Sequence, residues 1–320
     1  MSLASVPDSV AARANVAPFI HRTPLLSSRL LGEETGLEVR LKAEMLQRTG
    51  SYKIRGPLNK LALLSYEERS RGVVCSSAGN HAQGVALAAS MLDVPAVVVM
   101  AENATPSKVA ATRAYGAEVV LHGTIWDEAD EKARELVERE GLTYVHPFDD
   151  LDLIAGQGTL GLEIYEDWPE VEMVVVPIGG GGLISGVATA LKRERPDIRI
   201  VGVESADGPA MKTSLERGEL VTLDHVETII DGLRVKRVGQ TTFELAQRFV
   251  DEIVTVPDAT IFDNVVWMMS RAKLVVEGAA AAPVAALHSG TLSPAPGTKV
   301  ACVLSGGNLD LAQLEGLAWN

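Results

Sequence analysis

The stretch MVVVPIGGGGLISGVATALKR, residues 173–193, decides the fold because it places a strand, a glycine turn and a helix in direct succession. The apolar run 173–176 predicts a strand that is buried on both faces. Four glycines follow at 179–182, and residues 184–193 place their apolar side chains on one stripe, which predicts a helix. A strand that turns directly into a helix is the repeating unit of α/β proteins.

Short runs rich in valine and isoleucine recur along the chain, with amphipathic helical patterns between them. Alternating strands and helices predict an α/β protein built on open parallel sheets. No long stretch rich in glycine, serine and proline separates the runs, so we expect two parallel-sheet domains that share a crevice. The predicted strands are 73–75, 96–100, 118–121, 173–176, 199–203 and 299–304, and the predicted helices include 106–115, 126–140 and 184–193.

Composition limits the class of function. The chain has 320 residues, 47% of them hydrophobic, and a formal net charge of −13. That charge would repel nucleic acid and anionic lipid surfaces, so the expected partner is a small molecule. The most apolar window, 85–101, is interrupted by Asp93 and Pro95 and is too short for a membrane helix. We expect no basic, apolar leader at the N-terminus and therefore a cytoplasmic protein.

Three predicted strands run into turns that suit ligand binding, at 76–81, 178–183 and 305–308. Ligands of open α/β sheets bind at the carboxyl ends of the strands. The glycines of the second turn leave backbone N–H groups and a helix N-terminus free to converge on a phosphate. The alternative is a tight turn that needs glycine only for packing. The second turn lacks the lysine of a Walker motif and the acidic residue of a dinucleotide site, which disfavours ATP and NAD.

Spacing alone does not identify the reactive group. The first turn offers Ser77, Asn80 and His81 beside backbone amides, although asparagine and glycine are also ordinary turn residues. Lys53 lies in a stretch where cationic and apolar residues alternate, and Arg55 could lower the pKa of its amine. Most lysines, however, are solvated surface charges.

Taken together, these motifs resemble the fold type II family of pyridoxal 5'-phosphate (PLP) enzymes, specifically its threonine dehydratase and serine racemase branch. Lys53 and its neighbours resemble the family's Ser-Phe-Lys-x-Arg-Gly, with Tyr52 in place of phenylalanine and Pro57 after the glycine. The resemblance covers nearly the whole chain, through 22–25, 42–56, 76–86, 156–159, 179–183, 231–233, Glu277 and 305–308. It implies a large PLP-binding domain, residues 1–65 and 150–320, and a small domain, residues 66–149.

The resemblance also implies a role for each site residue. Lys53 would hold the cofactor covalently and act as the catalytic base. Asn80 would bind the ring hydroxyl and Ser305 the pyridine nitrogen, while Gly179, Gly180, Gly181, Gly182 and Leu183 would hold the phosphate. The substrate carboxylate would be bound by Ser77, Ala78, Gly79, Asn80 and His81.

The implied reaction is β-elimination from a β-hydroxy-L-amino acid. L-Threonine would give 2-oxobutanoate and ammonia, and L-serine would give pyruvate. The alternatives are a serine racemase, or a dehydratase for hydroxyaspartate or phenylserine. Ile54 argues against cysteine and threonine synthases, which resemble each other in carrying Asp after the lysine. A catalytically silent relative would be expected to lose Lys53. The family implies a homo-oligomer, a dimer or tetramer.

We expect no metal site. Cys75 and Cys302 lie far apart in apolar runs and are interpreted as buried, inert thiols. Serine racemases and some dehydratases resemble each other in having a divalent cation site near a glutamate, and Glu204 corresponds to that glutamate. Here Ala210 stands where the second carboxylate would be, which leaves too few anionic oxygens for Mg²⁺ or Ca²⁺. The remaining interpretation of Glu204 is structural.

Overall fold

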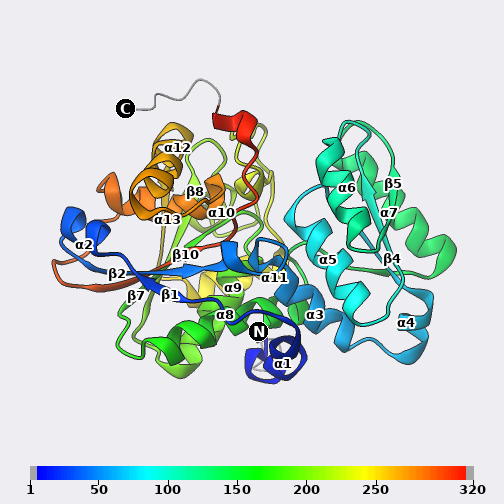
Figure 1. The fold of residues 1–320 in the computed structure, drawn as a ribbon, viewed down its shortest axis with the longest axis horizontal. Coiled ribbons are helices and arrows are strands. Elements are labelled where there is room, and N and C mark those ends of the chain that lie inside the picture. Colours follow the sequence, from blue (N-terminus) through cyan, green and yellow to red (C-terminus); the bar gives the residue numbers. More distant parts are fainter. Residues whose placement is uncertain (1–5, 315–320) are drawn as a thin grey trace.

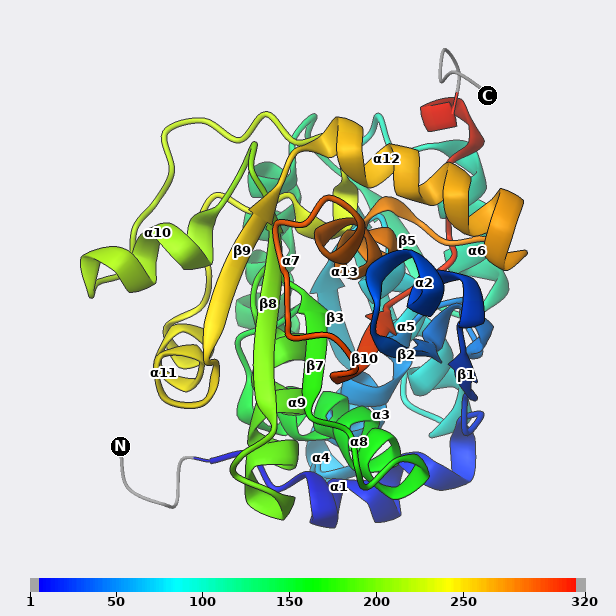
Figure 2. The same ribbon diagram turned by 90° about the vertical axis from the view of Figure 1, so that its left-hand side faces the viewer.

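A six-stranded sheet contains strands from both ends of the described residues. The structure is a computed structural model that describes residues 6–314. The strands pair in the order β1-β2-β10-β7-β8-β9, and every pair is parallel except β1 with β2. Figure 2 shows β10 between β2 and β7. The strands are β1 Leu25–Ser27, β2 Glu38–Ala43, β7 Met173–Pro177, β8 Arg199–Ser205, β9 Glu252–Val256 and β10 Lys299–Leu304.

A second, smaller sheet is formed entirely by the segment between β2 and β7. Its four strands pair in parallel in the order β5-β4-β3-β6. They are β3 Val73–Ser76, β4 Ala96–Met100, β5 Glu118–Leu121 and β6 Thr143–Tyr144. Figure 1 shows this part of the molecule, with its own helices, beside the large sheet.

Helices cover both faces of the large sheet, with α12 and α13 on one face and α8 and α9 on the other (Figure 1). The α-helices are α1 Ser9–Val16, α2 Arg29–Thr35, α3 Arg55–Ala62, α4 Tyr66–Arg71, α5 Asn80–Met91, α6 Pro106–Ala114, α7 Trp126–Glu140, α8 Leu151–Asp167, α9 Gly182–Glu194, α10 Ala210–Arg217, α11 Gln240–Phe249, α12 Asp258–Trp267 and α13 Gly278–His288. The shorter turns include η3 Glu44–Leu46, η4 Tyr52–Ile54, η5 Asp231–Leu233 and the π-helical turn η6 Met268–Ala272.

The strand β7 shows why an unbroken apolar run forms the centre of the sheet. Val174 and Val176 pack into the core with α9, whereas Met173 and Val175 pack into the core with α13. Successive side chains of a strand point to opposite faces, so a strand between two helical layers must be apolar at every position.

The predicted α/β class with two parallel sheets is confirmed, and each of the six predicted strands is present. The domain boundaries at residues 65 and 150 stay a prediction. Cys75 and Cys302 are buried, and burial raises the pKa of each thiol to about 12, as expected for inert cysteines. No helix within residues 6–314 is long and apolar enough to cross a membrane.

Candidate active site

The reactive candidate, Lys53, lies in the short turn η4 between the two sheets. Its Nζ donates a hydrogen bond to the carbonyl of Pro147 at 2.9 Å. Desolvation by the surrounding protein lowers the pKa of the Lys53 amine to about 8, while the negative charge of Glu277 opposes that shift. Near pH 8 about half of such an amine is neutral, and the neutral amine is the form that acts as a base or nucleophile.

Close packing holds the Lys53 backbone on two sides. A Cβ on Gly84 of α5 would lie 2.7 Å from the Lys53 carbonyl oxygen, so α5 approaches this closely only with glycine there. On the other side, Tyr52 N donates to Ser305 O at 3.0 Å, and Ser51 forms a β-bridge with Gly306. The backbone that carries the reactive side chain is therefore held between α5 and the loop that follows β10.

The proposed influence of Arg55 on Lys53 was wrong. The Arg55 guanidinium is fully buried and forms ion pairs with Glu44 and Glu163 at 2.7–2.8 Å. Its charge is balanced by these two carboxylates. The low pKa of Lys53 arises from burial.

The glycine turn joins β7 to α9. Gly181 has φ +94°, a left-handed conformation that favours glycine, and α9 begins at the next residue. The first N–H groups of a helix have no acceptor within it and can bind an anion. Gly180 is required for a different reason, since a Cβ there would lie 2.2 Å from the ring of Phe148. Thr242 Oγ1 fixes the turn by donating to Gly180 O at 2.8 Å.

The turn after β3 places Asn80 and His81 at the start of α5. His81 is buried, and burial lowers the pKa of its imidazole to about 3. Its Nε2 lies 2.9 Å from Val145 O. Because a carbonyl only accepts, Nε2 carries the single proton of this neutral ring. The imidazole N–H is therefore already used, and Nδ1, which has no partner within residues 6–314, can only accept. To an anion, His81 can offer only its backbone N–H.

Asn80 links the turns of the two sheets. Its Nδ2 lies 2.9 Å from both carboxylate oxygens of Glu277, and its Oδ1 accepts from Asn308 Nδ2 at 2.7 Å. Asn308 belongs to the turn after β10, which also contains Ser305. The predicted residues of the first and third turns thus lie together, near Lys53.

Comparison with known proteins identifies the family. The family model described as "Pyridoxal-phosphate dependent enzyme" matches residues 16–306. The chain belongs to this family. It is 49% identical to the L-threonine ammonia-lyase of Thermotoga maritima, over 97% of this chain and 77% of that protein. It is 45% identical to the catabolic L-threonine dehydratase of Escherichia coli K12, over 97% and 95% of the two chains.

The fold is also that of solved structures in the predicted branch. Maize serine racemase superposes with a TM-score of 0.93 and is 36% identical, covering 97% of this chain and 96% of the racemase. The two-domain fold type II architecture expected from the sequence is thereby confirmed.

The residues present fit PLP, the cofactor of this family. Ser305 Oγ is buried, and no group within residues 6–314 hydrogen-bonds to it. A buried hydroxyl without a partner is costly, so a ring nitrogen that accepts its proton would satisfy it. The Lys53 amine and the open N-terminus of α9 supply the other two requirements of the cofactor, an imine-forming nitrogen and a phosphate site.

Several residues of the site had no predicted role. Glu277 and Asn308 were included in the resemblance, but neither was placed at the cofactor. Burial raises the pKa of Glu277, and its position just before the alanine-rich α13 reads in the sequence as an ordinary helix start. The Pro147 carbonyl gave no signal, because every residue has a backbone carbonyl.

Glu204 caps a helix. Its two carboxylate oxygens accept from Met211 N and Lys212 N, each at 2.8 Å, at the start of α10. Burial raises the pKa of this carboxyl to about 7. Within residues 6–314 no group of three or more His, Cys, Asp or Glu side chains could hold a metal ion. The geometry supports the structural interpretation of Glu204.

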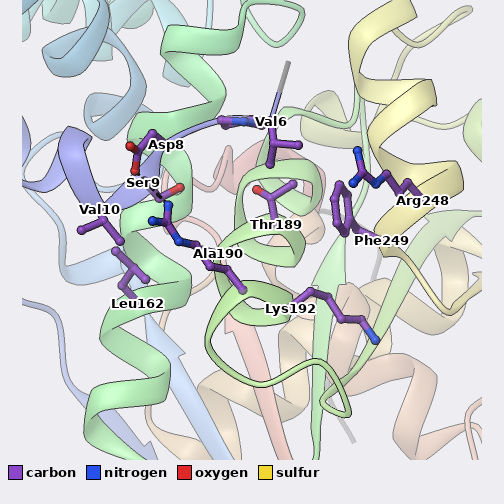
Figure 3. A pocket seen from close by; sticks show the side chains of 12 residues that line it. Val6, Asp8, Ser9, Val10, Leu162, Thr189, Ala190, Lys192, Arg248 and Phe249 are labelled. Atoms are coloured by element: carbon purple, nitrogen blue, oxygen red, sulfur yellow. Dashed lines mark hydrogen bonds and ion pairs between the residues drawn. The ribbon is translucent and has the colours of Figure 1, made fainter. Parts of the chain in front are cut away.

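Figure 3 shows residues that line a cavity, whose volume is about 390 Å³. Val6 to Val10, α8, α9 and α11 line it, with the side chains of Lys192, Arg193 and Arg248 at its walls. None of the predicted site residues lines this cavity. It therefore plays no part in the site built around Lys53.

Proposed function

We propose that the protein is a PLP-dependent ammonia-lyase that converts L-threonine to 2-oxobutanoate and ammonia, and L-serine to pyruvate and ammonia. The observation that carries the proposal is the Lys53 amine, with its pKa lowered to about 8, between the two sheets of a family member. The names of its relatives, L-threonine ammonia-lyase and L-threonine dehydratase, support this choice of reaction.

Lys53 is the proposed catalytic base. PLP, when bound, accepts the electron pair that remains at Cα after proton removal. The neutral Lys53 amine takes the Cα proton, and the Pro147 carbonyl within 2.9 Å of Nζ orients it. The Cβ–O bond then breaks, and the departing hydroxide takes up one proton, equal to the one removed from Cα, and leaves as water. The remaining enamine tautomerises to an imine, which takes up one water and gives the 2-oxo acid and ammonia.

The proposed carboxylate site is the turn from Ser77 to His81. Ser77 Oγ accepts from Gly79 N at 3.2 Å, which shapes the turn before α5. The N-terminus of α5 then offers backbone N–H groups, and its dipole favours an anion. Ala78 and Gly79 add no bulk that would hinder the substrate. The imidazole of His81 is assigned to the Val145 carbonyl and not to the substrate.

The proposed cofactor contacts follow the same geometry. Gly179 to Leu183 hold the phosphate at the start of α9, and Ser305 donates to the pyridine nitrogen. A neutral serine at that nitrogen does not fully protonate the ring, which favours elimination over storage of charge. Asn80 binds the ring hydroxyl with the amide that also contacts Glu277.

Serine racemisation is the second candidate, because the fold superposes closely on maize serine racemase. Inversion needs a second acid on the face of Cα opposite Lys53. By the family resemblance, that position is Ala78, whose methyl group carries no proton to donate. Elimination is therefore the preferred proposal.

A substrate panel tests the proposal. Purified holoenzyme would be incubated with L-threonine, L-serine, hydroxyaspartate and phenylserine, and the 2-oxo acid would be measured. We expect the highest kcat/KM with L-threonine. Absence of 2-oxo acid from both L-threonine and L-serine would refute the proposed function, whereas preference for another substrate would correct it.

Location and assembly complete the proposal. We infer a homo-oligomer in the cytoplasm, because the family resemblance implies a dimer or tetramer and the Escherichia coli relative is named as a catabolic enzyme. Light scattering of the purified holoenzyme and fractionation of the producing cell would test the two inferences separately. A monomer at enzyme concentrations used in assays would contradict the first.

A further inference from the structure

Four buried charged side chains form one cluster that includes Arg55, two residues after Lys53. We call Lys42, Glu44, Arg55 and Glu163 the ion cluster. Arg55 Nε and Nη2 donate to the two oxygens of Glu44, each at 2.8 Å. Arg55 Nη1 and Nη2 donate to the two oxygens of Glu163 at 2.7 and 2.9 Å. Lys42 Nζ donates to Glu163 at 2.6 Å.

The cluster is closed and charge-balanced. Two cations face two anions, and the side chains of Lys42, Glu44 and Arg55 have no exposed surface. Thr23 donates to Glu44, the Thr23 carbonyl accepts from Lys42 at 2.7 Å, and Thr159 accepts from Arg55 at 3.1 Å. The two carboxylates raise the pKa of the Arg55 guanidinium, so Arg55 stays charged although it is fully buried.

Stability alone does not explain such a cluster. Desolvation of buried ions offsets most of their attraction, and apolar residues of similar volume often stabilise a protein equally well. Hydrogen bonds between charged groups are directional, however, and they fix distances that apolar contacts leave free. A role in holding other residues at fixed distances therefore explains the cluster better than a role in stability.

The cluster joins four elements to one another near the turn that carries Lys53. Lys42 is the penultimate residue of β2, Glu44 begins η3, Glu163 lies in α8, and Arg55 begins α3 two residues after Lys53. The same α8 approaches the Arg55 backbone closely, because a Cβ on Gly156 would lie 2.5 Å from Arg55 O. The guanidinium thus ties the short turn that carries Lys53 directly to η3 and α8, and through Glu163 to Lys42 of β2.

We propose that Arg55 is a positioning residue, which holds Lys53 in its reactive placement through the ion cluster. The inference rests on the proposed function of Lys53 as base. A shift of about 1 Å in a catalytic group is enough to slow a reaction by about a hundredfold. Because the charges of the cluster balance each other, the pKa of Lys53 is set by its burial and by the charge of Glu277.

A charge-balanced double substitution separates positioning from stability. Arg55→Met with Glu44→Met removes one cation and one anion and leaves Lys42 paired with Glu163. We expect a melting temperature equal to that of the parent or higher, since the removed pair was fully desolvated. We also expect kcat to fall at least about tenfold while KM changes less than about threefold.

A spectroscopic measurement reports on the site without turnover. Circular dichroism in the visible band of bound PLP depends on how rigidly the cofactor is held, and we expect its amplitude to fall to about half or less. The matched control is Arg22→Met with Asp167→Met. That pair also ties a cation to α8 and joins at 2.6 Å, but it is partly exposed at the surface. The control should change neither kcat nor the dichroic band.

A double variant with the kcat and the dichroic band of the parent would overturn the proposal and leave the cluster a structural feature. If that variant does not fold, Arg55→Lys provides the test, because one ammonium cannot reproduce four hydrogen bonds to two carboxylates. The same losses are expected there. If the parent has no elimination activity, the proposed function is refuted. The dichroic band of bound PLP is measured without turnover, so it still tests whether Arg55 holds Lys53 in place.

Discussion

The amide nitrogen of Asn80 lies 2.9 Å from each carboxylate oxygen of Glu277 and joins the two sheets beside Lys53. Asn80 begins α5 of the small sheet, and Glu277 directly precedes α13, which covers the large one. This hydrogen-bonded contact therefore links the two sheets through Glu277, and the charge of Glu277 raises the pKa of the Lys53 amine.

Substituting Glu277 should move the pH dependence of the reaction. The negative charge of Glu277 raises the pKa of Lys53 against the larger effect of burial. Glu277→Gln removes that charge, so the pKa of Lys53 should fall below about 8. More of the amine is then neutral at a given pH, and the acidic limb of the kcat profile should shift to lower pH. Glu277→Asp, which keeps the charge, is the control; a shift to higher pH in Glu277→Gln would contradict this electrostatic role.

Lys53→Ala should abolish both the visible absorbance of bound PLP and turnover, because the amine is the proposed covalent anchor and base. The fold should persist, since within residues 6–314 the one hydrogen bond of Lys53 Nζ is to Pro147. Absorbance spectra and a melting curve would measure both halves. Substantial activity of the variant without an added amine would show that another residue is the base.

Gly180→Asp should weaken PLP binding severely. Its Cβ would lie 2.2–2.5 Å from ring atoms of Phe148, and its charge would face the proposed phosphate site. Gly180→Ala separates these two effects, because it introduces the steric conflict without the charge. We expect a graded loss of affinity, from parent to alanine to aspartate, in a titration of PLP. Equal affinity of all three proteins would place the phosphate elsewhere.

Ala78→Ser should introduce measurable racemisation. A serine hydroxyl at this position could return a proton to the face of Cα opposite Lys53, whereas the methyl group of Ala78 cannot. The parent should convert L-serine to pyruvate with little D-serine. Chiral chromatography after incubation with L-serine measures both products, and abundant D-serine from the parent would favour the racemase alternative.

The sequence predicted the valine-rich strands and the amphipathic helices α6, α7 and α9, but it missed elements whose pattern is interrupted by charged residues or glycines. The central strand β7 was evident from its valines. The strand β2 was not predicted, because Arg40 and Lys42 interrupt its apolar pattern, and the burial of Lys42 depends on Glu163, far along the chain. The helix α8 contains Gly156, Gly158 and Gly161, which lower its helix propensity and allow its close contacts with neighbouring backbone.

The site was predictable only to the extent that its residues belong to recognisable motifs. Lys53 was selected by family resemblance, since nothing in its local spacing distinguishes it from a surface lysine. The cause of its low pKa was assigned wrongly to Arg55, because the pairing of Arg55 with Glu44 and Glu163 depends on tertiary contacts. The Pro147 carbonyl could not be found at all, since main-chain groups carry no signature in a sequence.

The place of β10 between β2 and β7 determines when the protein can assemble during its biosynthesis. The small sheet needs only strands from residues 73–144, so it can form while translation continues. The strand β2 ends ten residues before Lys53, and it has no inner neighbour until residues 299–304 leave the ribosome. Until then two open strand edges are exposed to chaperones, proteases and other nascent chains. Lys53 is synthesised early, but its surroundings are completed only after β10.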